Sequence, residues 1–141
     1  MDSILFDNTN LTIRYITGDD YLLLKWNGFA EGQYFRFLTN QVLQAIEKTG
    51  TKRILSDNTH WRTISPNDRG WAANYWFTKA VEEGIRKLAT VLSNELFHRI
   101  AERSIEAMAS PECMQIKNFS SIEDAQAWLK TADNLKNCKT E

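Results

Sequence analysis

The hydrophobic period of this chain switches repeatedly between about 2 residues, as in strands, and about 3.6 residues, as in helices. Apolar and polar residues alternate from residue 11 to 16, which indicates a strand with one face in water. Residues 21–26 are almost all apolar and follow a Gly18-Asp19-Asp20 turn, so the two segments predict an antiparallel hairpin. Helical spacing then begins at Phe35 and is ended by Gly50.

Strand-like and helix-like segments continue to alternate through the rest of the sequence. Ser65, Pro66 and Asp68 have the spacing of a helix start, with a capping box and proline at the first helical position. Gly84 is expected to end that helix, and Ser121 to cap the last one. The remaining strands are expected at 52–56, 86–92 and 114–119, and the remaining helices after Ser65, over 95–108 and after Ser121.

This order of elements predicts an α/β fold with a mixed sheet of five strands in chain order, flanked by four helices. The antiparallel N-terminal hairpin is followed by parallel strand–helix units, because a helix between two strands favours a right-handed crossover. We expect the alternating strands 11–16 and 114–119 at the edges of the sheet. The continuously apolar strands 21–26 and 86–92 should be central and covered on both faces.

Size and composition limit the class of protein. The 141 residues suit one domain, expected over residues 1–132, with a polar C-terminal tail over 133–141. No apolar run approaches the ~18 residues of a membrane span. A net charge of −1 argues against general nucleic-acid binding, which usually needs a strongly basic patch.

The residues that could hold a metal or form disulfides are few. Cys113 and Cys138 have no metal-binding or Cys-x-x-Cys spacing, so we expect reduced thiols. Residues 1–3 lack the features of a signal peptide, and a cytoplasmic location is therefore expected. The two histidines have no partner at ligand spacing, so we expect no metal site and no cofactor.

With this element order, several segments resemble the STAS/SpoIIAA-like family of small bacterial single-domain proteins, over roughly residues 10–131. They are Ser56-Asp57-Asn58, Ser65-Pro66-Asn67-Asp68, Trp71, Trp76-Phe77, residues 84–92 and residues 119–129. The resemblance implies a SpoIIAA-like fold. Functions are mostly uncharacterised in this branch, and the family also includes lipid- or nucleotide-associated modules, so the fold alone does not choose a role.

The same resemblance makes Ser65 a candidate phosphoacceptor. In the STAS family a strand-end acid, matched here by Asp57, leads to a helix that starts with a phosphorylatable serine in an Asp-Ser-Ser-Gly-like motif. Here Pro66 follows Ser65 and the motif's glycine is missing, which argues against phosphorylation. Ser65 can instead be only the N-cap of its helix, and Asp68, already in the first turn, favours that interpretation.

Polar residues at the end of the strand 52–56 form the second candidate site. Ser56, Asp57 and Asn58 could serve a ligand pocket, or could hydrogen-bond the backbone of their own loop. His60 could act as a base or be a surface residue of that loop. No nucleophile, base and orienting group can be named together, so we expect no enzyme activity.

The helix after Ser65 carries aromatic residues on two opposite sides. At 100° per residue one side carries apolar residues that should pack on the sheet. Trp71 and Tyr75 lie on the opposite, polar side, beside Thr78 and Glu82, and could form a contact surface or pack under a neighbouring segment. The side expected to face the sheet carries Ala73, Trp76, Phe77 and Ala80.

Two functions follow from these features. The first is a non-enzymatic, STAS-like regulatory module that binds a protein partner or itself through the loop 57–65 and the helix 66–83. The alternative is a small-molecule or lipid-binding domain with a pocket at the strand end 56–61, lined by tryptophans. The binding surface of the regulatory module would comprise Asp57, Trp61, Ser65, Trp71 and Tyr75. The tryptophans that line the pocket of the ligand-binding domain would be Trp26, Trp61 and Trp76.

Overall fold

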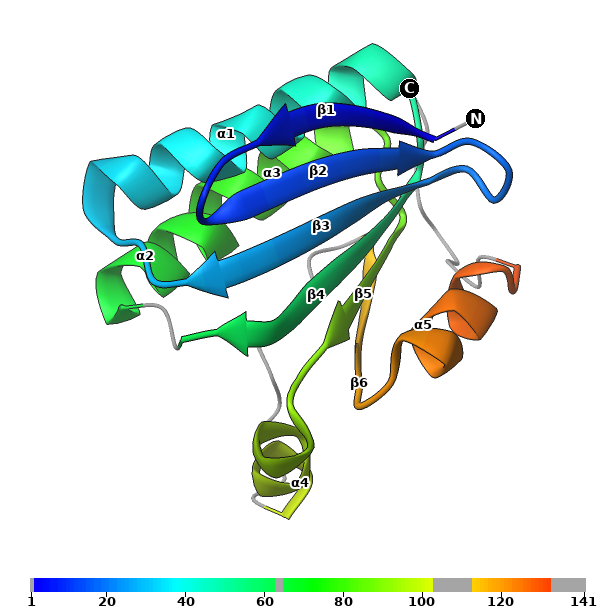
Figure 1. Cartoon of the computed structure of the whole chain (residues 1–141). Coiled ribbons are helices and arrows are strands. Elements are labelled where there is room, and N and C mark those ends of the chain that lie inside the picture. Colours follow the sequence, from blue (N-terminus) through cyan, green and yellow to red (C-terminus); the bar gives the residue numbers. More distant parts are fainter. Residues whose placement is uncertain (1, 63–64, 103–112, 133–141) are drawn as a thin grey trace.

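A computed structural model describes residues 2–62, 65–102 and 113–132 of the chain. The tail expected over 133–141 and the second half of the helix expected over 95–108 lie outside these residues. The described strands form one mixed sheet of six strands in chain order (Figure 1). The expected α/β class, the antiparallel start and the parallel continuation are therefore confirmed.

The bounds of the elements follow the expected order closely. They are β1 Ser3–Asp7, β2 Leu11–Ile16, β3 Tyr21–Gly28, α1 Gly32–Thr49, β4 Arg53–Trp61, α2 Pro66–Trp71, the π-helical turn η1 Ala72–Trp76, α3 Phe77–Glu82, β5 Lys87–Val91, α4 Asn94–Glu102, β6 Gln115–Phe119 and α5 Ile122–Leu129.

The expected number of five strands is wrong because β1 was not anticipated. β1 pairs antiparallel with the outer side of β2, so β2 is an inner strand and not an edge. A register shift between Ile4 and Phe6 interrupts the pairing. The strand has only five residues, too short for a clear period-2 pattern, and it is stabilised by pairing with β2. The expectation that β6 is an edge strand is confirmed.

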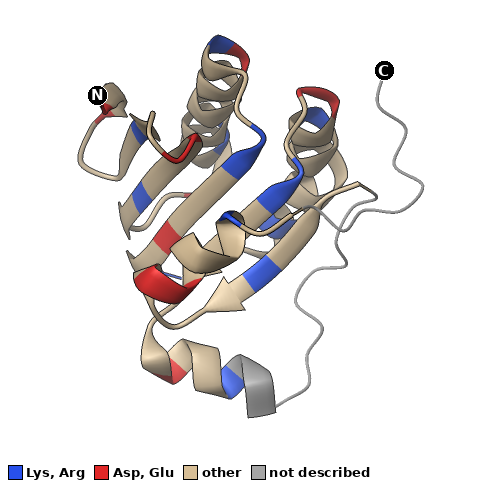
Figure 2. Ribbon diagram, turned by 90° about the vertical axis from the view of Figure 1, so that its right-hand side faces the viewer, with Lys and Arg blue, Asp and Glu red and all other residues tan. Residues whose placement is uncertain are grey.

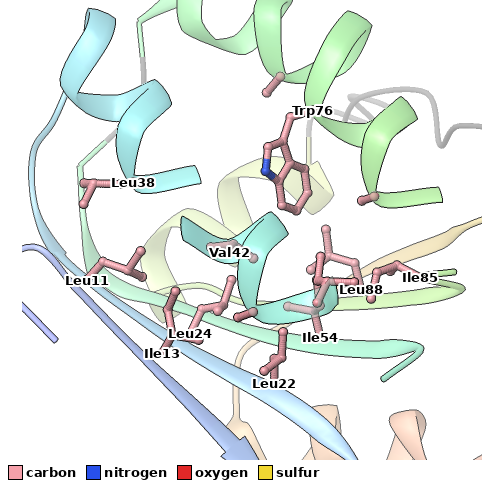
Figure 3. Close-up of a cluster of buried hydrophobic side chains, with 14 of the residues drawn as sticks. Leu11, Ile13, Leu22, Leu24, Leu38, Val42, Ile54, Trp76, Ile85 and Leu88 are labelled. Atoms are coloured by element: carbon pink, nitrogen blue, oxygen red, sulfur yellow. The ribbon is translucent and has the colours of Figure 1, made fainter. Parts of the chain in front are cut away.

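Helices cover the two faces of the sheet unequally. α1 and the α2–η1–α3 segment lie on one face, where their apolar side chains meet β2, β3, β4 and β5 in the larger core cluster (Figures 1 and 3). α5 packs on the opposite face, over Leu55, Ala89 and Val91. Each β-strand alternates its side chains between these two faces, and this alternation decides which polar residues can meet.

The helix that follows β4 is continuous from Pro66 to Glu82 but contains a π-helical turn. Trp76, Phe77 and Ala80 are buried as expected, whereas Ala73 is exposed and Ala72 takes its place in the core. Uniform α-helical geometry predicts the wrong alanine. A π turn closes i→i+5 hydrogen bonds, and the extra residue shifts the buried side by one position.

Cys113 is disulfide-bonded in this structure, contrary to the expectation of reduced thiols. Cys138, the other cysteine of the sequence, lies outside the described residues. Spacing along the chain does not reveal such a bond, because disulfide pairing depends on how the fold brings distant cysteines together. Among the described helices, none is long and apolar enough to cross a membrane.

Candidate functional site

Strand β4 extends to Trp61, so most of the segment expected as a loop over 57–65 is part of the sheet. Asp57 pairs with Lys25 and His60 pairs with Asn27, with a register shift between the two pairs. Asp and Asn have low strand propensity, but here the extended end of β3 supplies a pairing partner that overrides it. The prediction of His60 as a loop residue is wrong for the same reason, although His60 is exposed.

Ser56 belongs to a buried polar chain on the face covered by α1. The indole Nε1 of Trp26 donates to Ser56 Oγ at 3.0 Å, and Ser56 Oγ donates to Asn58 Oδ1 at 2.7 Å. Ser56 is only 6% exposed. Its hydroxyl therefore satisfies the indole N–H of a core tryptophan, which would otherwise be buried without an acceptor.

Asp57 faces the opposite side of the sheet, as strand alternation requires. Its Oδ1 accepts from the backbone N–H of Thr59 at 3.1 Å and from Thr59 Oγ1 at 2.6 Å. These bonds hold the irregular strand end in shape, as the alternative of local backbone hydrogen bonding expected. His60, paired with Asn27, also lies away from Trp26 and Ser56, so the sheet separates Ser56 from His60.

Ser65 is the N-cap of α2. Its Oγ accepts from the backbone N–H of Asp68 at 3.2 Å, and its hydroxyl donates to Asp68 Oδ2 at 2.9 Å. The same Oδ2 accepts from the backbone N–H of Gly32, the first residue of α1. Asp68 is 2% exposed, so its carboxylate joins the N-termini of two helices inside the protein.

A row of aromatic rings in contact leads from the end of β4 to the surface of the π turn. The ring centroids of Trp61 and Trp26 are 5.0 Å apart, and those of Trp26 and Phe35 are 6.2 Å apart. Phe35 meets Trp71 edge to face at 6.4 Å, and Trp71 stacks on Tyr75 at 5.3 Å. Trp71 is half-buried, while Tyr75 is 45% exposed, so the row emerges into water at Tyr75.

Trp76 does not join this row. Its indole Nε1 donates to the carbonyl oxygen of Thr39 at 2.7 Å, and its ring lies in the core between the helices and the sheet (Figure 3). Trp26 is also a core residue. Of the three tryptophans expected to line a pocket, only Trp61 is partly exposed.

Two positively charged side chains lie over the last two rings of the row, those of Trp71 and Tyr75. The guanidinium carbon of Arg36 lies 5.1 Å from the centroid of Trp71, and Lys79 Nζ lies 5.8 Å from the centroid of Tyr75. We refer to Arg36, Trp71, Tyr75 and Lys79 as the Trp71–Tyr75 surface. The prediction that Trp71 and Tyr75 face away from the sheet together is confirmed for Tyr75, and Trp71 additionally packs against Phe35 of the neighbouring helix.

A second exposed aromatic group was missed at the sequence level. Tyr34 and Phe37 of α1 stack at 6.4 Å, and Phe37 meets Phe6 of β1 edge to face. The Tyr34 hydroxyl donates to Asn10 and accepts from Asn8. The available signal was that Tyr34 and Phe37 fall outside the apolar stripe of α1, which the helical spacing from Phe35 defines.

Charged residues of both signs are dispersed along the strands and helices in Figure 2. In the part of the chain that the structure describes, no three His, Cys, Asp or Glu side chains are grouped so as to hold a metal ion. What the geometry does bring together is aromatic surface and positive charge, beside a junction of two helix N-termini.

Comparison with known proteins identifies the fold. No protein-family model matches the chain, and no curated protein shows significant sequence similarity to it. The solved structures that are similar include an uncharacterised protein of the DUF3478 family with a SpoIIAA-like fold from Shewanella loihica PV-4. It aligns over 92% of this chain and 95% of its own, with a TM-score of 0.53 and 20% identity. The expected SpoIIAA-like fold is therefore confirmed.

Proposed function

We propose that this chain is a STAS-like regulatory module without enzyme activity, which binds a protein partner or a second copy of itself. The Trp71–Tyr75 surface is the binding site in this proposal. The observation that carries it is the exposure of Tyr75, which is stacked on Trp71 and has the ammonium group of Lys79 over its ring. Aromatic residues and arginine are the types enriched in protein interfaces and in their energetic centres.

The rigidity of the surface supports the same proposal. Trp71 contacts Phe35 edge to face and has the guanidinium of Arg36 over its ring, so the ring is already in place before a partner arrives. A preorganised aromatic loses little conformational entropy on binding, which favours affinity. The helix that carries Trp71 begins at a junction where Asp68 ties it to α1, and the surface therefore moves with the core.

Ser65 acts as a cap in this proposal and not as a phosphoacceptor. Its hydroxyl already exchanges hydrogen bonds with Asp68. A phosphate on Ser65 would bring negative charge against the buried carboxylate of Asp68, and like charges at this separation repel. Phosphorylation of Ser65 would therefore disrupt the start of α2 and could not act as a signal to a partner.

The test compares two exposed aromatic residues. Tyr75→Ala removes the outer ring of the surface, and Phe37→Ala removes a ring of similar exposure, 47%, on the other flank of α1. We expect light scattering with size-exclusion chromatography, and pull-downs from extract of the source cells, to show a dimer or a partner for the native chain and for Phe37→Ala. Tyr75→Ala should lose it. A monomer that captures nothing, or equal behaviour of both variants, would contradict the proposal.

We also propose a cytoplasmic location. The bond at Cys113 is the observation that speaks against it, because disulfides are rare in reducing compartments. The test is the redox state of Cys113 in living cells. Cells are quenched rapidly with acid, free thiols are alkylated, and the Cys113 peptide is examined by mass spectrometry. We expect the alkylated peptide; an oxidised Cys113 in living cells would place the protein in an oxidising compartment.

A further inference from the structure

In the described part of the chain, the guanidinium group of Arg36 has no hydrogen-bond acceptor. The residue is half-buried on α1, and its Nε is shielded from water with no hydrogen-bond partner. No hydrogen bond or salt bridge of its side chain occurs within residues 2–62, 65–102 and 113–132. An arginine side chain offers five N–H donors in a fixed fork. Here the guanidinium carbon lies over the ring of Trp71, and no described residue accepts a hydrogen bond from the fork.

Two other charged residues of this region, Asp68 and Lys79, already have partners. Asp68 accepts from Gly32 and Ser65, and Lys79 forms an ion pair with Glu82 at 3.6 Å. Counting only partners among the described residues, the positive charge of Arg36 is therefore the uncompensated one on the Trp71–Tyr75 surface. It lies over the ring of Trp71, the same ring on which the exposed Tyr75 is stacked.

We propose that the Trp71–Tyr75 surface recognises a peptide segment of a protein partner in which an Asp or Glu side chain stands next to an apolar one. This inference rests on the proposed function and specifies its partner. The carboxylate would take the two terminal NH₂ groups of Arg36, because the guanidinium fork matches a carboxylate bidentately and Nε is shielded. The apolar side chain would cover the exposed ring of Tyr75, whose hydroxyl remains in water.

Trp71 fixes the spacing of these two contacts. It holds the cation 5.1 Å from its own ring and the ring of Tyr75 at 5.3 Å, so the acid and the apolar residue must be close neighbours in the bound segment. A polyanion such as nucleic acid is a weaker fit, because the net charge of the chain is −1 and Arg36 is a single uncompensated charge. Charge complementarity with an acidic peptide needs no more than that one cation.

The probe is a phage library of random dodecapeptides, selected on the immobilised full chain. We expect enriched peptides to share an Asp or Glu beside an aliphatic or aromatic residue. A synthetic peptide of the consensus should bind about tenfold more weakly to Arg36→Met and to Tyr75→Ala, the size of loss typical of a central interface residue. Arg14→Met, an exposed arginine on strand β2, is the matched control and should bind as the native chain does.

A double-mutant cycle isolates the charge contact. Changing the acid of the peptide to its amide should weaken binding to the native chain, and should have little further effect on Arg36→Met. Arg36→Met keeps the aliphatic stem over Trp71, and thermal melting confirms that it is folded. No enriched sequence, a consensus without an acid, or binding of Arg36→Met within twofold of the native chain overturns the inference.

The outcomes also separate this inference from the proposed function. If Tyr75→Ala loses its dimer or partner while Arg36→Met keeps it, the interaction module stands and the acidic-peptide partner is wrong. If neither variant changes anything, both are wrong.

Discussion

The carboxylate of Asp68 in α2 accepts a hydrogen bond of 2.9 Å from the backbone N–H of Gly32, the first residue of α1, although the two are 36 positions apart. Glu31, the N-cap of α1, makes no capping hydrogen bond with its own side chain. Asp68 therefore supplies the cap that α1 lacks while serving the first turn of α2. One buried acid therefore links the starts of the two helices.

Replacing Asp68 by alanine should lower the free energy of unfolding by ~2 kcal/mol, within the range for a lost helix cap or an unsatisfied buried donor. The matched control is Asp124→Ala. Asp124 holds the same position after its cap Ser121 in α5, but it is exposed, and among the described residues its side chain makes no hydrogen bond to a second helix. Urea unfolding followed by circular dichroism measures both variants. Equal losses would show that Asp68 acts only within its own helix.

The indole of Trp26 depends on Ser56 for its hydrogen-bond acceptor. Ser56→Ala should destabilise the protein by ~1–3 kcal/mol, because a buried N–H is left unpaired. Thr90→Val is the control, since Thr90 pairs with Ser56 on the next strand and its hydroxyl has no hydrogen bond in the described part of the chain. We expect Thr90→Val to change stability by less than ~1 kcal/mol. A stable Ser56→Ala variant that has lost binding would instead assign Ser56 to a ligand site.

Lys87 joins β5 to the end of α5. Its side chain is 1% exposed, and Nζ donates to the carbonyl oxygens of Trp128 and Thr131 and to Thr131 Oγ1. A cation at the C-terminal carbonyls of a helix also favours the helix dipole.

Lys87→Met should therefore cost ~2 kcal/mol, the scale of hydrogen bonds to a charged group. Lys117→Met, an exposed lysine on the neighbouring strand β6, should stay within ~0.5 kcal/mol of the native chain. Thermal melting reports both, and near-equal melting temperatures would mean that the buried charge contributes no net stability.

Tyr15 titrates above its usual range. The hydrogen bond from its hydroxyl to Asp20 Oδ1, at 2.8 Å, raises the pKa of Tyr15, with smaller contributions from burial and from the charge of Asp20. A raised pKa means that the folded state favours the protonated phenol.

This stabilisation should be fully present below the unfolded pKa of about 10 and should be lost as the pH rises through the higher folded value. Tyrosine absorbance titration should show a late step that disappears in Tyr15→Phe. The stability difference between native chain and Tyr15→Phe should also shrink with increasing pH above ~10. A titration curve unchanged by the substitution would rule out this assignment.

Local signals predicted the elements that depend on neighbours in sequence. Ser65 and Ser121 both cap the helices that they precede, each accepting the N–H three residues on. Gly50 ends α1 with a φ of 69°, in the left-handed region that favours glycine. These interactions span a few residues, and the residue types alone determine them.

Features that depend on distant segments were not predictable in the same way. β1 is too short to show a clear period-2 pattern in the sequence, and it forms because it pairs with the otherwise unpaired edge of β2. β4 continues to Trp61 because β3 also continues, and the register places Ser56 and His60 on opposite faces. The aromatic pair at Trp71 and Tyr75 was visible at helical spacing, but Arg36 comes from another helix, and nothing in the sequence indicates that its guanidinium stacks on Trp71.

The amino-acid sequence by itself determined the α/β class, the order of the elements and the helix starts, because hydrophobic period and capping act over one or two turns of chain. The tertiary structure alone decided that Asp68 caps α1, that Lys87 is buried and that Arg36 lies over Trp71. Those contacts form only when the sheet brings together helices and strands that are far apart in the chain, and no local pattern encodes which side chains then meet.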